Sequence, residues 1–123
     1  MTVLMLAFAG GVGAAARFVL DGLIRNRLRT ALPWATILIN VSGSLLLGFI
    51  GGLVMKGQAP ESVQLVLGTG FLGGYTTFST ASLETIRLVQ GGRTGLAILN
   101  GLGSMAASVA AAAAGVGMAW LLP

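Results

Sequence analysis

The feature that most constrains this chain is a glycine- and threonine-rich patch at residues 70–80, inside an apolar stretch long enough to cross a bilayer. Glycine lowers helix stability by roughly 1 kcal/mol, and threonine is restricted at χ1. The pattern therefore predicts a membrane-spanning helix with a break over residues 73–77. Peptide groups freed by such a break need partners from protein, water or an ion, and broken helices line transport pathways. The patch indicates transport.

The composition indicates an all-α integral membrane protein. Of 123 residues, 55% are hydrophobic and 8% are charged, whereas soluble domains carry about 25% charged residues. A span needs about 20 residues, so the chain has room for one domain of four transmembrane helices. We expect them near residues 3–24, 34–55, 61–88 and 94–122. The expected location is the cell inner (plasma) membrane.

The residue types exclude most enzyme chemistry. The chain has no Cys and no His, which removes thiol chemistry and the commonest transition-metal ligand. Ser79 and Thr80 therefore lack a base that could activate them, and we do not expect an enzyme. The net charge of +4 comes from basic residues that flank apolar spans, where they act as topology determinants.

Polar side chains recur at helical spacing along three of the expected spans, and they predict a polar track. The members are Asn40, Ser44, Ser79, Thr80, Asn100, Ser104 and Ser108. Steps of four place the residues of each span on one face. Helix–helix hydrogen bonding is the alternative interpretation, but polar groups at membrane depth are usually partnered or functional. Hydroxyls and carboxamides donate hydrogen bonds, so the track suits an anion.

Charged side chains are expected toward the helix ends. Arg17 and Asp21 lie four residues apart and can pair on one face. Glu84 follows the polar patch by about one turn. It belongs either to an ion-access vestibule or to a solvated helix end where it pairs with Arg87. Two other functions compete with an anion pathway: a small proton-coupled multidrug exporter and a non-transporting membrane adaptor. No carboxylate is expected near the midplane, which disfavours the exporter.

Three sequence blocks resemble the small bacterial fluoride ion channels of the Fluc (CrcB) family. They are Gly10-Gly-Val-Gly-Ala-Ala-Ala-Arg17, the segment around Asn40 with Ser42-Gly43-Ser44, and Gly70-Phe-Leu-Gly-Gly-Tyr-Thr-Thr-Phe-Ser-Thr80 followed by Glu84-Thr85. The third block is the specific one. The resemblance implies passive export of fluoride, which relieves cytoplasmic fluoride toxicity. It also implies an antiparallel dual-topology dimer with two pores at the subunit interface.

The resemblance further implies roles for individual residues. A structural sodium ion at the two-fold axis would be held by the backbone carbonyls of Gly73 and Thr76. The pore positions would be Asn40, Phe78, Ser79, Thr80, Ser104 and Ser108, and Arg17 would be structural. Ala81 stands where the family has a second pore phenylalanine, and Asn100 stands where many relatives place a tyrosine. The phenylalanine pair is therefore incomplete in this chain.

The charge distribution leaves the dimer partner open. The first and third connections carry Arg25, Arg27, Arg29 and Arg93, and Arg87 lies nearby. The second connection carries Lys56 as its one basic residue. The positive-inside rule then predicts one orientation, with both termini outside. A homodimer of opposed subunits needs a chain whose basic residues are nearly balanced between the two sides of the membrane. A second copy and a homologous subunit of opposite bias both remain candidate partners.

Overall fold

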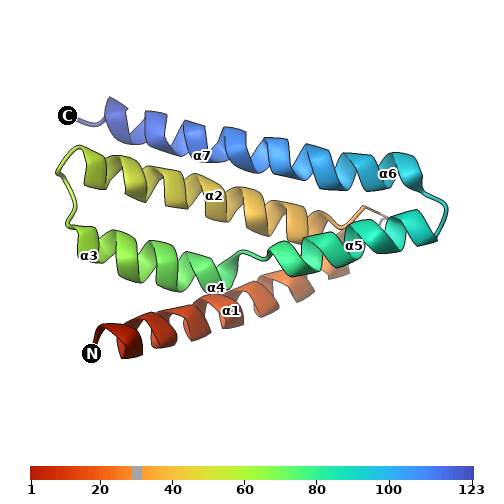
Figure 1. Cartoon of the computed structure of the whole chain (residues 1–123), viewed down its shortest axis with the longest axis horizontal. Coiled ribbons are helices and arrows are strands. Elements are labelled where there is room, and N and C mark those ends of the chain that lie inside the picture. Colours follow the sequence, from red (N-terminus) through yellow and green to blue (C-terminus); the bar gives the residue numbers. More distant parts are fainter. Residues whose placement is uncertain (29–31) are drawn as a thin grey trace.

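The fold is a bundle of four helical rods that alternate in direction (Figure 1). The computed structural model describes residues 1–28 and 32–123, without the side chains of residues 78–80. Every regular element within those ranges is helical. The first two rods are the single helices α1 (Thr2–Arg27) and α2 (Trp34–Met55). The third rod consists of α3 (Glu61–Val63), the π-helix η1 (Gln64–Leu72), α4 (Gly73–Tyr75) and α5 (Phe78–Gln90). The fourth rod consists of α6 (Thr94–Ile98), the π-helix η2 (Leu99–Gly103) and α7 (Ser104–Leu121).

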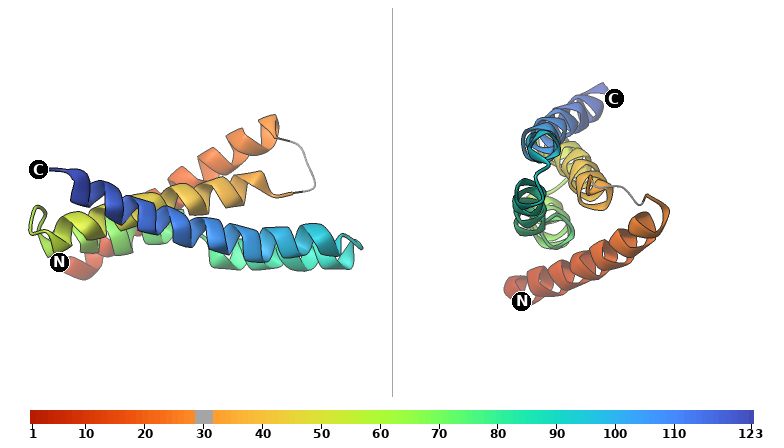
Figure 2. Two further views of the ribbon diagram at one scale, coloured as in Figure 1. Left: turned by 90° about the horizontal axis from the view of Figure 1, so that it is seen from above. Right: turned by 90° about the vertical axis from the view of Figure 1, so that its right-hand side faces the viewer.

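The two ends of the bundle differ in what they carry. Both termini and the α2–α3 loop lie at one end, here called the terminal end, and the α5–α6 turn lies at the other, here called the turn end (Figure 1). Figure 2 shows α7 lying along α2, whereas α1 diverges from α2 toward the turn end. The α2–α7 contact is the most extensive between any two elements.

The helix bounds follow the prediction closely except at the ends and the break. The second helix has the expected bounds, and α1 extends to Arg27 where the prediction ended near residue 24. Among the described residues, three helices are long and apolar enough to cross a membrane: α1, α2 and Thr94–Leu121. The third rod is divided, so its two pieces are each shorter than a full span.

The third rod is interrupted, but the predicted break was too wide. Gly73–Tyr75 is helical, and only Thr76 and Thr77 leave the helix. Gly74 lies within α4, where α1 approaches it closely: a Cβ at Gly74 would collide with the carbonyl of Gly10. The glycine thus permits helix packing, as small residues do in membranes, and it does not disrupt the helix.

Small residues also allow the close contact between α2 and α7. A Cβ at Gly48 would meet the backbone of Ala112, and a Cβ at Gly115 would meet the carbonyl oxygen of Leu45. Gly117, on the same helix, has open space where its Cβ would be. Helix association in lipid depends on such backbone proximity, because lipid is as apolar as the helices themselves.

The terminal end is fastened by a side chain that caps the last helix. The Lys56 Nζ donates hydrogen bonds to the carbonyl oxygens of Ala119 at 2.9 Å and Leu122 at 2.5 Å. It also lies 5.7 Å from the centroid of the Trp120 ring. A cation at a helix C-terminus is favoured by the helix dipole. Lys56 therefore joins the end of α2 to the end of α7.

The glycine contacts predict opposite effects for two neighbouring substitutions. Gly117→Ala should leave thermal stability unchanged or raise it, since alanine is the better helix former by roughly 1 kcal/mol. Gly115→Ala should lower stability by about 1–3 kcal/mol, because the new methyl group overpacks the α2–α7 contact. Thermal unfolding in detergent, followed by circular dichroism, measures both. Equal shifts for the two variants would contradict the packing described above.

Candidate functional site

A cavity of about 540 Å³ lies between α2, the third rod and the fourth rod, with the break at its middle. We call it the central groove. Its polar lining consists of Asn40, Ser44, Thr69, Thr76, Thr77, Ser82, Thr85, Ser104 and Ser108, and its remaining lining of Leu47, Gly68, Leu72, Gly73, Ala81, Gly101 and Met105. The lining mixes hydroxyl and amide groups with apolar side chains and contains no charged residue among those described.

The groove brings together many of the residues that the sequence predicted. Asn40, Gly73, Thr76, Ala81, Ser104 and Ser108 all line it. Phe78, Ser79 and Thr80 belong to the first turn of α5, but their side chains lie outside the described residues, so their pore role stays a prediction. The predicted track residues of α2 and α7 thus share one cavity with the helix break.

Asn40 holds the break in place through two hydrogen bonds to one residue. Its Nδ2 donates to the carbonyl oxygen of Thr77, and its Oδ1 accepts from the Thr77 amide, each at 2.8 Å. A carboxamide has the same donor and acceptor pair as a peptide group, so it can replace the helical partners that Thr77 loses. Unpaired peptide groups at membrane depth cost several kcal/mol. Asn40 is therefore a structural clamp as well as a groove residue.

The helix that ends at the break is closed by Thr76 and anchored by Tyr75. Thr76 has φ −82° and ψ 158°, an extended conformation. Its amide and its Oγ1 both donate to the Leu72 carbonyl oxygen at 2.9 Å. The Tyr75 hydroxyl lies 3.0 Å from the Ser42 Oγ, and Tyr75 packs against Ile39 in the core. These contacts fix where the helix stops.

The end of this helix suits a hard cation better than a transition metal. Backbone carbonyls at a helix C-terminus carry the negative end of the helix dipole, and oxygen ligands suit hard cations. Gly73 is exposed, and its missing side chain leaves the backbone approachable, because a Cβ there would meet only the Gly68 carbonyl oxygen at 3.9 Å. No cluster of three or more His, Cys, Asp or Glu occurs among the described residues.

Arg17 contacts the same helix end. Its Nε donates to the Gly74 carbonyl oxygen at 3.4 Å, a long hydrogen bond from α1 to α4. The predicted pair of Arg17 with Asp21 is wrong: Asp21 instead accepts from the Arg25 Nε at 2.8 Å, one turn later on α1. Spacing allows Asp21 to pair in either direction along the helix, and Arg25 also reaches Glu84.

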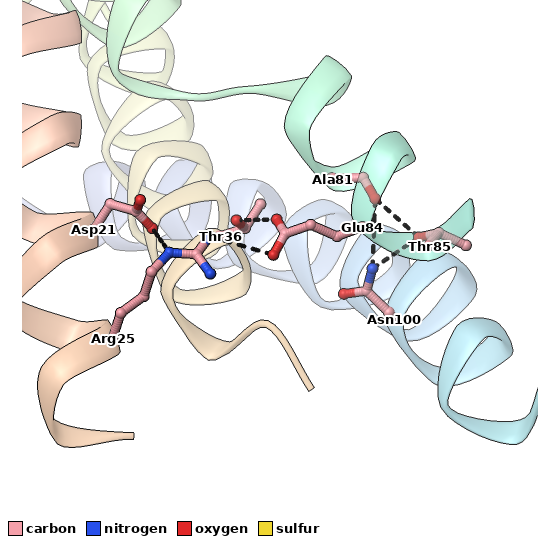
Figure 3. Close-up of polar contacts among 7 residues, drawn as sticks. All are labelled: Asp21, Arg25, Thr36, Ala81, Glu84, Thr85 and Asn100. Atoms are coloured by element: carbon pink, nitrogen blue, oxygen red, sulfur yellow. Dashed lines mark hydrogen bonds and ion pairs between the residues drawn. The ribbon is translucent and has the colours of Figure 1, made fainter. Parts of the chain in front are cut away.

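Glu84 joins three helices at the turn end (Figure 3). Its carboxylate accepts a hydrogen bond from the Thr36 Oγ1 on α2 and lies 3.3 Å from the Arg25 Nη2 on α1. The solvated pair with Arg87 that the sequence allowed is therefore wrong. Glu84 is absent from the residues that line the central groove, so its predicted vestibule role remains untested.

Asn100 does not belong to the polar track. It is 1% exposed, and its Nδ2 donates to the Thr85 Oγ1 at 2.7 Å and lies 3.5 Å from the Ala81 carbonyl oxygen (Figure 3). The Thr85 Oγ1 in turn donates to the Ala81 carbonyl at 2.9 Å. Ser104 also donates back to the Asn100 carbonyl. Asn100 thus joins η2 to α5 by hydrogen bonds. For this residue the alternative interpretation, helix–helix hydrogen bonding, is the one that the structure supports.

Several threonines that line the site or bond to its residues were not predicted from the sequence. Thr85 lines the groove and bonds Asn100, Thr36 holds Glu84, and Thr77 is the residue that Asn40 clamps. Thr85 follows the groove residue Ala81 by four residues, so helical spacing could have placed it on the same face. The partner of Thr36 comes from 48 residues away, and no local pattern indicates it.

Comparison with known proteins assigns the family. Residues 4–116 match the family model described as CrcB-like protein, Camphor Resistance (CrcB). The chain belongs to this CrcB-like family. It is 48% identical over 121 residues to the fluoride-specific ion channel FluC 1 of Leifsonia xyli, covering 98% of this chain and 86% of that relative. The resemblance inferred from the sequence motifs is thereby confirmed.

Other relatives of this family carry the same kind of name. The fluoride-specific ion channel FluC of Rhodopseudomonas palustris is 44% identical over 119 residues, which is 96% of each chain. That of Thermus thermophilus is 39% identical over 102 residues, 83% of this chain and 82% of the relative. The family is one of channels and not of enzymes. With its three membrane-capable helices, this chain is a multi-pass membrane protein.

The clamp on Thr77 predicts a local effect of substituting Asn40. Asn40→Leu keeps the approximate size but removes both hydrogen bonds to Thr77, and each lost bond should cost about 1–3 kcal/mol. Hydrogen exchange of the Thr77 amide, followed by mass spectrometry, should then accelerate by about tenfold or more. Ser44→Ala, on the same helix and in the same groove, is the control and should leave this exchange unchanged. Unaltered exchange in Asn40→Leu would rule out the clamp.

Proposed function

We propose that this protein is a fluoride-selective channel that lets fluoride leave the cell passively and so reduces its toxicity. The observation that carries the proposal is the central groove, where hydroxyl groups from three rods meet beside a broken helix. A relative that is 48% identical is named as a fluoride-specific ion channel. The uncharged, donor-bearing lining supports passage of a small anion.

The groove offers weak donors that can replace part of an anion's hydration shell. Ser104 and Ser108 lie one turn apart on the fourth rod, and Ser44 and Thr69 face the same cavity. A hydroxyl can rotate to donate toward an anion and then release it, whereas a fixed positive charge would hold it. The Nδ2 of Asn40 has a second proton beyond the one given to Thr77, so Asn40 can hold the break and also donate into the groove.

The proposal includes four transmembrane helices per subunit and an antiparallel dual-topology dimer with two pores at its interface. Large apolar side chains remain exposed on every long helix, such as Phe8 at 76% and Val109 at 66%, which gives room for both lipid and a partner. The pore residues would be Asn40, Phe78, Ser79, Thr80, Ser104 and Ser108. The partner would be a second copy or a homologous subunit, and only a homologous subunit would supply the ring edges that Ala81 lacks.

The proposal also includes a structural sodium ion at the two-fold axis. The backbone carbonyls of Gly73 and Thr76 would hold it, two from each subunit. Bound there, the ion would neutralise carbonyl dipoles at the helix end and add positive potential beside an anion path. Arg17, which already donates to Gly74 on the same helix end, would support this site from α1 without binding the ion.

The two alternatives make different demands on the same groove. A proton-coupled drug exporter needs a titratable carboxylate in its path, and none of the described groove residues is acidic. A membrane adaptor needs no polar cavity. The groove therefore favours a channel over both.

Fluoride efflux from proteoliposomes tests the proposal. Purified chain should release fluoride, measured with a fluoride electrode, more than about tenfold faster than chloride, a difference of about 1.4 kcal/mol. Ser108→Ala should slow fluoride by about fivefold, because one hydroxyl donor is lost. Val109 is the next residue and is 66% exposed. Val109→Ala is therefore the matched control, and it should leave the rate of fluoride efflux unchanged. Absence of any transport would favour the adaptor, and proton-driven exchange of a cationic drug would favour the exporter.

The same assay separates the two dimer partners. Ala81→Phe restores an aromatic edge beside the groove. Fluoride efflux by the purified chain should rise if two copies form complete pores. An unchanged or lower rate, together with recovery of efflux when a homologous subunit is co-purified, would assign the missing aromatic residues to that subunit.

A further inference from the structure

A second cavity lies at the turn end, away from the central groove. Its volume is about 330 Å³, and it is lined by Pro33, Glu84, Arg87, Leu88, Gly91 and Arg93. We call it the turn-end pocket. It shares none of its lining residues with the groove. Its walls come from the start of α2, the last turns of α5 and the α5–α6 turn.

The charge that this pocket can offer to a ligand is positive. Glu84 is the acidic residue in the lining, and its carboxylate is already bound by Arg25 and Thr36, with 11% of the side chain exposed. Arg87 and Arg93 form no ion pair with any of the described residues, and both are exposed. Two guanidinium groups therefore face one pocket without an anion.

The surroundings of the pocket are those of a membrane interface. Leu83 lies one turn before Arg87 on the same face of α5, toward the middle of the bundle, and is 48% exposed. Trp34, the first residue of α2, follows the pocket residue Pro33 and is 38% exposed. Indole rings settle at headgroup depth. Apolar side chains next to two free arginines suit a ligand with an anionic head and hydrocarbon tails.

We propose that the turn-end pocket binds the phosphodiester headgroup of an anionic phospholipid. Arg87 and Arg93 contact the phosphate, since guanidinium groups pair with phosphate oxygens through two parallel hydrogen bonds. The acyl chains lie along α5 at the exposed Leu83, toward the middle of the bundle. A membrane lipid can contact the two arginines, the exposed apolar surface of α5 and the Trp34 ring, whereas a free phosphate ion would contact the arginines alone.

The opposite end of the bundle offers no equivalent among the described residues. Lys56, its basic residue, already donates to the carbonyls of Ala119 and Leu122. Among the described residues, the basic groups that lack an ion-pair partner and line a pocket therefore lie at the turn end. This site is independent of the proposed fluoride channel, because it rests on residues outside the groove and on the membrane location.

Native mass spectrometry of the purified full chain in detergent tests the lipid site. Added phosphatidylglycerol should stay bound and phosphatidylcholine should not. Arg87→Gln and Arg93→Gln should each reduce phosphatidylglycerol occupancy by about fivefold, as expected for one arginine near an anionic headgroup. Arg87→Lys should retain part of the binding because it keeps the charge. Arg27→Gln, which removes an exposed charge outside the pocket, is the matched control and should have no effect.

Three outcomes would overturn the proposal. Equal retention of phosphatidylcholine would exclude recognition of an anionic lipid. Displacement of phosphatidylglycerol by an equal concentration of inorganic phosphate would assign the pocket to a free anion. An equal loss in Arg27→Gln would mean diffuse attraction to the turn end and not binding in the pocket. Circular dichroism of each variant establishes that it is folded, and none of these results depends on fluoride transport.

Discussion

The structure depends on how a single interrupted peptide segment is satisfied inside the membrane. Thr76 and Thr77 leave the helix, and a break in lipid would ordinarily strand donors and acceptors without water. Asn40 resolves this for Thr77 by pairing with both its amide and its carbonyl at 2.8 Å. A side chain from α2 thus takes over what the third rod's own helix would have supplied. The break is stable because another helix completes it.

The central groove follows from that break. A continuous third rod would present the regular surface that α1 and α2 present, whereas the interrupted rod turns polar groups toward α2 and α7. Glycines such as Gly48 and Gly115 let α2 and α7, which both line the groove, pack closely together. An uncharged lining with hydrogen-bond donors is also what passage of a small anion requires, and it connects the fold with the proposed fluoride pathway.

The sequence predicted what depends on local pattern and missed what depends on distant partners. Apolar run lengths gave the bounds of α2, and the cluster of polar residues indicated the groove. The glycines were misassigned to the break because a glycine's role depends on what packs against it, here Gly10 against Gly74. Asn100 was misplaced because its spacing fits the track, yet its side chain turns to Thr85 on another rod.

The most direct test of the account is thiol labelling of the groove from water, since the chain has no cysteine of its own. Ser108→Cys and Val109→Cys are neighbours on α7, but Ser108 lines the groove and Val109 lies on the exposed apolar face. In sealed proteoliposomes a membrane-impermeant thiol reagent should modify position 108 and slow fluoride efflux, while position 109 stays unmodified. Equal labelling of both positions, or labelling of 109 alone, would contradict a hydrated groove at membrane depth.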